Sequence, residues 1–283
     1  MKSAILDIED KSCFSAVWSR QVGKDVKQMP NEPIFSITPE ISNLLVDIGL
    51  RLGEIRAVRP EPVSPKLRRE NRIRTIHSTL AIENNTLTLA QVTALLDGKR
   101  VLGHPVEIKE VTNAAQAYDL MFQLNPNSID DLLKAHRILM NGLIKENGRF
   151  RDGNVGIYEG EAVVHIAPPA KFVPQLIGDL FSWYQNSPLT PLIKSAVFHY
   201  EFEFIHPFAD GNGRLGRMWH TLLLGQWADV FYWLPIEELI KERQADYYRA
   251  LGESDQRADS TVFIETILEI IQDSLRGLQD TAE

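Results

Sequence analysis

The chain has 283 residues, of which 44% are hydrophobic and 24% charged, a composition typical of a soluble globular protein with a sizeable core. Its formal net charge of −8 argues against nucleic acid as the main partner, because phosphates repel a negatively charged surface. The single Cys13 excludes an intramolecular disulfide, the first residues lack the apolar stretch of a signal peptide, and no apolar run is long enough to span a bilayer. We therefore expect a cytoplasmic protein with no membrane partner.

The first third of the chain is expected to be helical. Residues 41–55 carry Ile and Leu at a spacing that places them on one face of a helix, as core or interface positions. The stretch from Pro60 to Pro65 interrupts this pattern and predicts a linker. Residues 75–89 follow, with the sequence TIHSTLAIENNTLTL. Taken alone, they indicate one more helix turn whose acidic residue, Glu83, is solvated like most exposed carboxylates.

The middle of the chain contains two breaks and a predicted hairpin. Residues 125–129 resemble a helix N-cap region, and residues 186–191 form a second break. Short β-branched runs around a glycine-containing turn predict a β-hairpin at about residues 153–166, the one strand pair that the sequence indicates. Considered alone, a surface hairpin with His165 on an edge strand explains this pattern equally well.

Residues 206–217, HPFADGNGRLGR, combine groups that suit a bound phosphate. Gly211 and Gly213 tolerate a positive φ, so successive N–H groups of the turn can converge on an anion. A helix is predicted to begin directly afterwards at Arg214, and the free N–H groups and positive dipole end of a helix favour phosphate. Arg214 and Arg217 are three residues apart on one helix face, and guanidinium groups bind phosphate oxygens well.

Two further side chains of this run point to catalysis on a polyphosphate. Asp210 supplies a carboxylate of the kind that holds Mg²⁺ together with phosphate oxygens. His206 ends the preceding apolar segment and is suited to act as a general base near neutral pH. A histidine beside a proline often only ends a helix, and Gly-Asn-Gly is an ordinary turn. The concentration of polar groups between apolar segments nevertheless favours a shared ligand.

The last part of the chain adds an aromatic pair and a final helix. Tyr247 and Tyr248 lie on a predicted helix, where such a pair is more often part of the core. Residues 264–278 again repeat Ile and Leu at helical spacing, as a core or interface stripe.

The run 206–217 matches without departure the signature His-x-Phe-x-(Asp/Glu)-Gly-Asn-Gly-Arg-x-x-Arg, so the chain resembles the Fic family. Members of this family mostly transfer AMP from ATP to a hydroxyl of a target protein. The resemblance implies a mainly α Fic fold, a helical bundle with a small β-hairpin flap next to the active-site loop. It divides the chain into an N-terminal helical region at 1–110, a Fic core at 111–255 and a C-terminal helix at 256–283.

The resemblance also implies a role for each residue of the site. His206 would deprotonate the Ser, Thr or Tyr hydroxyl of the target, Asp210 would hold Mg²⁺, and Phe208 would be a buried anchor. Arg214 and Arg217 would take the β- and γ-phosphates, and an aromatic ring would lie against adenine, with Tyr247 as the candidate and Tyr248 as the alternative. The expected ATP-binding set consists of Gly211, Asn212, Gly213, Arg214, Leu215, Gly216 and Arg217 in the signature, Val163, Val164 and His165 in the flap, and Tyr247.

A second motif resembles the Fic subclass that carries an inhibitory helix upstream of its core. Thr79, Glu83 and Asn84 fit the pattern (Ser/Thr)-x-x-x-Glu-(Gly/Asn), although some members have Gly where Asn84 stands. The resemblance implies that Glu83 pairs bidentately with Arg217 and occupies the place of the γ-phosphate. ATP would then bind in a pose that hides its α-phosphate.

Three interpretations of function remain open at this stage. The first is an adenylyltransferase that modifies a target protein or itself and is inhibited by Glu83. The second is an ATP-sensing regulatory or interaction protein without transfer. The third is a Fic enzyme that removes AMP or transfers another phosphate-bearing group. Members of the family often dimerise, so a homodimer is a further expectation, while the sequence leaves the oligomeric state and the target open.

Overall fold

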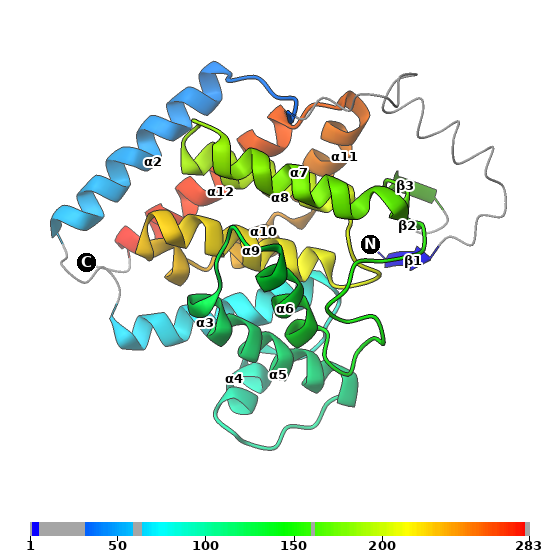
Figure 1. The fold of residues 1–283 in the computed structure, drawn as a ribbon. Helices are drawn as coiled ribbons and strands as arrows, with labels where there is room; N and C mark the ends of the chain where they lie inside the picture. Colours follow the sequence, from blue (N-terminus) through cyan, green and yellow to red (C-terminus); the bar gives the residue numbers. More distant parts are fainter. Residues whose placement is uncertain (1, 6–31, 59–63, 160–161, 281–283) are drawn as a thin grey trace.

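Helices make up most of the structure, a computed structural model that describes residues 2–5, 32–58, 64–159 and 162–280 (Figure 1). The mainly α fold that the sequence predicts is confirmed. Cys13 lies outside the described residues. No described helix is both long and apolar enough to cross a membrane. The helices are α2 (Pro39–Val58), α3 (Pro65–Ile82), α4 (Leu89–Leu96), α5 (Pro105–Leu120), α6 (Ile129–Leu139), α7 (Val173–Asn186), α8 (Pro191–Ile205), α9 (Asn212–Trp227), α10 (Ile236–Glu242), α11 (Gln244–Arg257) and α12 (Thr261–Asp280).

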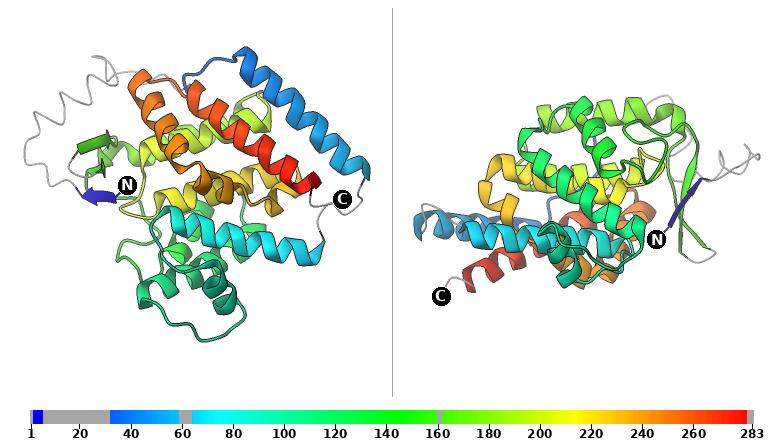
Figure 2. Two further views of the ribbon diagram at one scale, coloured as in Figure 1. Left: turned by 180° about the vertical axis from the view of Figure 1, so that it is seen from behind. Right: turned by 90° about the horizontal axis from the view of Figure 1, so that it is seen from below.

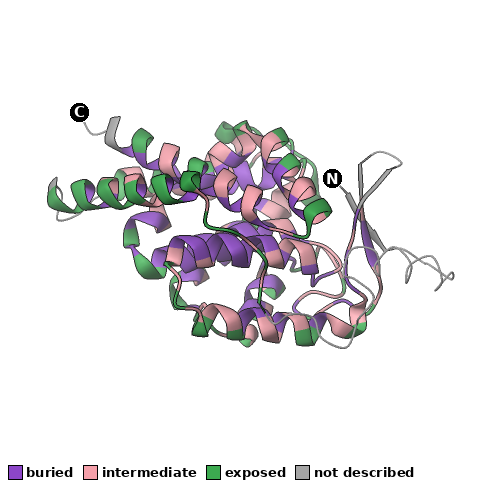
Figure 3. Ribbon diagram, turned by 90° about the horizontal axis from the view of Figure 1, so that it is seen from above, coloured by how far each residue is buried: buried purple, intermediate pink, exposed green. Residues whose placement is uncertain are grey.

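The helices pack around two apolar clusters that share α8 and α9. The first cluster joins α2, α10, α11 and α12, and it contains the predicted stripes at 41–55 and 264–278. The helical prediction for both stripes is confirmed, and Figure 2 shows α2 and α12 lying side by side. The second cluster joins α3, α5, α6 and α7. Buried residues gather in the central helices and exposed ones on the outer helices (Figure 3).

Polar residues at the helix ends set where several helices begin. Ser64 caps α3, and Pro65 is the first residue of that helix rather than part of a linker; residues 59–63 lie outside the described part. Ser128 caps α6 and Thr190 caps α8, as the breaks in the sequence indicate.

The expected domain boundaries at 110/111 and 255/256 fall inside α5 and α11.

A small antiparallel sheet lies at one end of the helices (Figure 2). The predicted hairpin forms from β2 (Val155–Glu159) and β3 (Ala162–Ile166), with a register shift at Ile157 and Tyr158. The expectation of one strand pair is wrong, because β1 (Lys2–Ile5) pairs with the other side of β2. In the order β1-β2-β3, β3 has no strand on its outer side among the described residues.

Candidate active site

A pocket lies where the end of α8, the start of α9, α11 and the sheet meet. It brings together His206, Asp210 and Arg217 of the signature with Glu83 at the end of α3. Arg214, Leu215 and Gly216, which the sequence predicts to bind ATP, do not line it. The side chains of Val163 and Val164 lie outside the described part of the chain. The lining residues are Glu83, Ile157, His165, Glu203, Phe204, His206, Asp210, Gly211, Asn212, Gly213, Arg217, Tyr247, Tyr248, Leu251, Gly252 and Asp255.

The turn between α8 and α9 has a fixed backbone. Gly211 has a φ of +85° and precedes α9, which begins at Asn212, two residues before the predicted start. Gly213 is helical, so of the two glycines that tolerate a positive φ only Gly211 adopts one. The Asn212 side chain accepts from Phe208 N (2.9 Å) and donates to Phe208 O (2.8 Å), so it locks the loop. The backbone N–H groups of the first turn of α9 have no intrahelical acceptor, and such groups at a helix N-terminus suit an anion.

Glu83 and Arg217 form an ion pair beside this first turn of α9. Arg217 Nη2 donates to Glu83 Oε1 (2.7 Å) and to Thr79 O (3.0 Å), while Nε donates to Thr79 Oγ1 (3.0 Å). The predicted bidentate pairing is wrong, because a single hydrogen bond joins the two side chains among the described residues. A Cβ added to Gly213 would lie 2.5 Å from Glu83 Oε1, which shows how closely the carboxylate approaches the first turn of α9.

Charge complementarity holds this buried pair in its ionised form. The Arg217 side chain is 1% exposed and the Glu83 side chain 26%. Burial alone would raise the pKa of Glu83, but the charges of Arg217 and Arg214 lower it below its ordinary value. Burial alone would likewise lower the pKa of Arg217, but Glu83 raises it. Removing Glu83 would leave a buried, fully charged guanidinium facing the pocket.

Glu83 is held at the end of α3 by the turn that follows it. The helix ends at Ile82, so Glu83 is its C-cap rather than an interior residue. Asn84 has a φ of +70°, a left-handed conformation that Gly adopts without strain and Asn tolerates better than most residues. This conformation explains why Gly and Asn are the two residues that the motif allows at this position.

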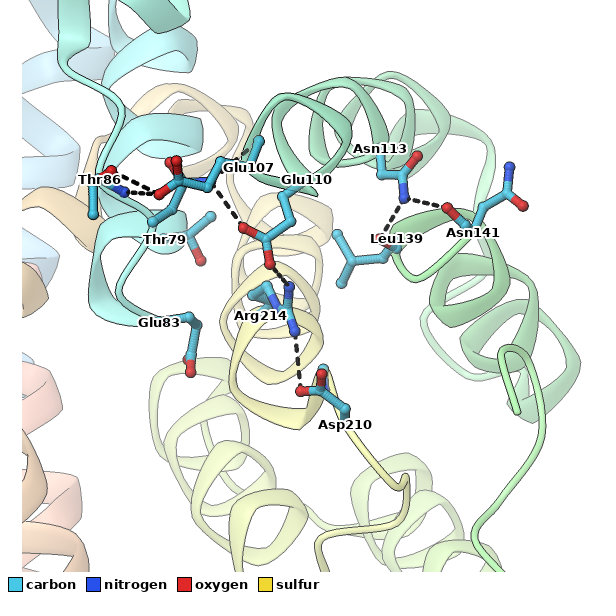
Figure 4. A network of polar contacts seen from close by, with 12 residues as sticks. Thr79, Glu83, Thr86, Glu107, Glu110, Asn113, Leu139, Asn141, Asp210 and Arg214 are labelled. Atoms are coloured by element: carbon cyan, nitrogen blue, oxygen red, sulfur yellow. Dashed lines mark hydrogen bonds and ion pairs between the residues drawn. The ribbon is translucent and has the colours of Figure 1, made fainter. Parts of the chain in front are cut away.

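Arg214 lies between two carboxylates instead of facing the pocket (Figure 4). Its Nη1 donates to Glu110 Oε1 (2.8 Å) and its Nη2 to Asp210 Oδ1 (3.0 Å), and the side chain is 6% exposed. Asn85 Nδ2 donates to the other oxygen of Glu110 (2.8 Å). A chain of contacts thus joins the turn after Glu83 to the loop that carries Asp210. The sequence analysis missed Glu110, which lies on α5.

Asp210 keeps one oxygen available for a ligand. Its side chain is 48% exposed. Oδ1 accepts from Gly211 N (2.6 Å) and from Arg214, whereas Oδ2 has no hydrogen bond among the described residues. A carboxylate with a free oxygen beside backbone amides fits Mg²⁺, which is usually bound by one or two carboxylates plus phosphate oxygens.

His206 sits in a strained backbone conformation at the end of α8. Its φ is +49°, and the residue is 7% exposed. Burial and the charges of His165 and Arg151 lower its pKa from 6.5 to about 3, so the imidazole is neutral. Nδ1 has no hydrogen-bond partner among the described residues. A neutral imidazole at the pocket wall can accept a proton from a ligand.

Phe208 points away from the pocket into the core. It is fully buried, and its ring stacks on His136 at a centroid distance of 3.7 Å. Gly148 N donates to His136 Nδ1 (2.9 Å), so His136 Nε2 carries the proton and donates to Asp210 O (2.9 Å). His136 therefore supports the loop from α6 both by stacking and by a hydrogen bond, and the sequence analysis missed it.

The far end of the pocket contains the flap and the two tyrosines. His165 lies between Phe204 O (2.9 Å from Nε2) and Asp255 Oδ2 (2.7 Å from Nδ1), which ties β3 to α8 and α11. Tyr247 is 1% exposed, and its hydroxyl bonds His199 Nε2 (3.1 Å). Tyr248 is only partly buried, so its ring has more surface for a ligand than that of Tyr247.

Comparisons with known proteins find similar sequences and similar structures. Residues 126–224 match the Fic/DOC family. A solved structure described as a Fic family protein from Desulfovibrio desulfuricans G20 is 52% identical, with a TM-score of 0.86, and the match covers 89% of this chain and 77% of that one. The solved Fic-1 of C. elegans (aa134–508) has a TM-score of 0.72 at 23% identity, covering 85% and 72% of the two chains, and shows the same fold.

Curated relatives are similar over part of their length. Protein adenylyltransferase fic-1 of Caenorhabditis briggsae is 31% identical over 198 residues, which cover 66% of this chain and 37% of the relative. Protein adenylyltransferase Fic of Drosophila mojavensis is 28% identical over 276 residues, which cover 92% of this chain and 50% of the relative. The chain thus spans half or less of the length of these two relatives.

Proposed function

This chain belongs to the Fic/DOC family, and on that premise we propose that it is a protein adenylyltransferase, which transfers AMP from ATP to a Ser, Thr or Tyr hydroxyl of a target protein or of itself. The observation that carries the proposal is one pocket that joins a neutral His206, the half-exposed carboxylate of Asp210, the N-terminal turn of α9 and Arg217. The curated relatives named protein adenylyltransferase support the same reaction.

The triphosphate is expected to bind along the start of α9. Its oxygens would accept from the backbone N–H groups of the first turn, and the side chain of Arg217 would balance the charge of the terminal phosphate. Asp210 would hold Mg²⁺ through Oδ2, with Oδ1 fixed by Gly211 N and Arg214. When bound, the cation neutralises part of the phosphate charge. The partly exposed ring of Tyr248 is the better placed of the two tyrosines for a contact with adenine.

His206 provides the base for the transfer. Its neutral imidazole would take the proton of the target hydroxyl as the hydroxyl oxygen forms a bond to the α-phosphorus. The bond from the α-phosphorus to the oxygen bridging the β-phosphate breaks at the same centre, and pyrophosphate leaves. The negative charge of the bound triphosphate raises the proton affinity of the nearby imidazole, so the base becomes stronger only once ATP is present.

The sheet offers a place for the target. β1 occupies one edge of β2, and the outer edge of β3 has no strand partner among the described residues. An extended target segment could add to this edge by main-chain hydrogen bonds, which would register its hydroxyl beside His206. Since this mode binds backbone, the sequence around the hydroxyl would contribute little to the choice of target.

We further propose that Glu83 restrains the enzyme. Its carboxylate accepts a hydrogen bond from Arg217 and lies close to Gly213. A terminal phosphate bound by Arg217 would therefore be repelled by the negative charge of Glu83. A nucleotide that binds beside Glu83 would have to shift, and its α-phosphate would then be out of line with the target hydroxyl. Removing the carboxylate would free Arg217 for the phosphate.

Transfer is tested with ATP labelled on the α-phosphate, in a lysate and with the pure protein. Glu83→Gly is expected to incorporate label at least about tenfold faster than wild type, because one contact of a buried ion pair is worth more than about 1.4 kcal/mol. Glu83→Gln, which keeps the size and removes the charge, should act in the same direction. Label on the γ-phosphate should not be incorporated, and Glu83→Gly combined with His206→Ala should be inactive.

Two results would contradict the proposal. If Glu83→Gly incorporates no more label than its His206→Ala double variant, the chain is not an adenylyltransferase. Tight binding of Mg-ATP in calorimetry together with that result would support a nucleotide sensor instead. If wild type and Glu83→Gly transfer AMP at equal rates, the transferase proposal stands and the inhibitory role of Glu83 is wrong.

A further inference from the structure

Arg151 is a buried cation with no ion-pair partner among the described residues. It lies between α6 and β2 and is 4% exposed. Burial lowers the pKa of its guanidinium to about 10, so the group still carries its charge at neutral pH. A buried charge without a counter-ion is costly unless its donors are all satisfied by other polar groups. An arginine is therefore stable at this position only if neighbouring polar groups accept its hydrogen bonds.

Backbone carbonyls satisfy this guanidinium. Nε donates to His206 O (2.7 Å), Nη1 to Gly153 O (2.9 Å), and Nη2 to Pro168 O (2.5 Å) and Ile205 O (3.2 Å). The backbone N–H of Arg151 adds a hydrogen bond to Pro207 O (3.0 Å). Three successive carbonyls at the end of α8 are thus held by one residue.

These carbonyls lie at the C-terminal end of α8, where a cation is most favourable. The last carbonyls of a helix have no intrahelical donor, and the helix dipole places partial negative charge there. The chain also turns at this point, because His206 has a φ of +49°, which costs energy for a residue with a side chain. By binding the carbonyls before and at this residue, Arg151 stabilises the strained turn that aims the imidazole into the pocket.

The same guanidinium reaches both ends of the flap. Gly153 precedes β2, and Pro168 follows β3. One planar group therefore fixes the spacing between the base and the two strands beside it. Arg151 does not line the pocket, so it would act on the base and the flap without contacting the nucleotide.

We propose that Arg151 is a positioning residue that sets the register between His206 and the target-binding flap. This inference rests on the proposed adenylyl transfer and adds to it a residue that would change the rate of the chemical step but not the affinity for ATP. A lysine would keep the charge at this site, but a compact ammonium cannot reach four carbonyls that lie around a planar fork.

The test compares Arg151→Lys and Arg151→Gln with Arg149→Lys, all in the Glu83→Gly protein. Arg149 is the matched control, because it lies two residues earlier and its side chain is 62% exposed. Steady-state AMP transfer gives kcat and KM for ATP, and hydrogen exchange with mass spectrometry follows the loop at 204–211 and the flap ends at 153–157 and 165–169. Thermal unfolding shows whether each variant is folded.

Arg151→Lys is expected to lower kcat on the order of 100-fold, the effect of misplacing a reacting group by about 1 Å, while KM for ATP stays within about threefold of the control. Exchange should rise in the loop and in both flap ends, and peptides of α2 and α12 should be unchanged.

Three results would overturn the proposal. One is a folded Arg151→Lys protein with the kcat of Arg149→Lys, and another is a rise in KM at unchanged kcat, which would mean a binding role. The third is loss of folding in both Arg151 variants, which would make the residue a general structural element. If the Glu83→Gly parent transfers no AMP, the proposed function fails, and exchange in the loop and flap still decides whether Arg151 couples them.

Discussion

Burial of His220 makes the stability of the protein depend on pH by an amount that can be worked out. The residue lies on α9, is 1% exposed, and burial lowers its pKa from 6.5 to about 3. As the pH falls below about 6.5, the unfolded chain takes up a proton at this position and the folded protein does not. The stability that depends on a neutral His220 is therefore fully present above about pH 6.5. It is lost as the pH falls from about 6.5 to about 3, where the folded protein also takes up the proton. At about pH 5 the loss is about 2 kcal/mol.

The substitution His220→Leu removes the titrating group and places an apolar side chain of similar size in the core. Urea unfolding of both proteins at several values between about pH 7.5 and 5 gives the difference in their free energies of unfolding. This difference should move by about 2 kcal/mol in favour of the variant over that range. His199, whose ring lies 5.0 Å away, has a pKa well below its ordinary value and stays neutral in both proteins. A difference that stays constant with pH would refute the reasoning.

The same unfolding assay at neutral pH checks four further substitutions. Ala258→Gly should raise the free energy of unfolding by about 0.5–1 kcal/mol, because the exposed Ala258 has a φ of +50°. Asn84→Ala should lower it by about 1 kcal/mol, since Ala tolerates the φ of +70° less well. Gly216→Ala should lower it by about 1–3 kcal/mol, because the added Cβ would overlap Glu203 Oε1, and an unchanged value would contradict that contact. Gly53→Ala, with open space around its Cβ in α2, should raise it by about 0.5–1 kcal/mol.

The parts of the fold that follow from local pattern could be predicted. The apolar stripes of α2 and α12 repeat at helical spacing, and the turn residues around 128 and 190 mark where helices begin. The strand β1 could not be predicted, because its partner β2 is far away in the sequence and pairs Lys2 with Tyr158. Short strands are recognised by their partners more than by their own residues.

The residues of the site likewise fall into those that could be predicted from the sequence and those that could not. The signature is contiguous, so its turn, its histidine and its carboxylate could be recognised together. Contacts between distant segments could not: Glu110 meets Arg214 across 104 residues, and the donors of Arg151 go to backbone carbonyls, which carry no side-chain signal. The arginine before the hairpin is visible in the sequence, but nothing there distinguishes it from the exposed Arg149. Magnesium binding, a homodimer and a cytoplasmic location stay predictions.

The signature loop lies at the junction of the two apolar clusters, because α8 and α9 on either side of it contribute residues to both. Loss of either cluster would remove part of the packing of both helices that carry the loop. Elements that share a core usually unfold cooperatively. Heat or urea should therefore abolish catalysis and tertiary structure in a single transition, without an inactive intermediate in which the helices persist and the loop has already been lost.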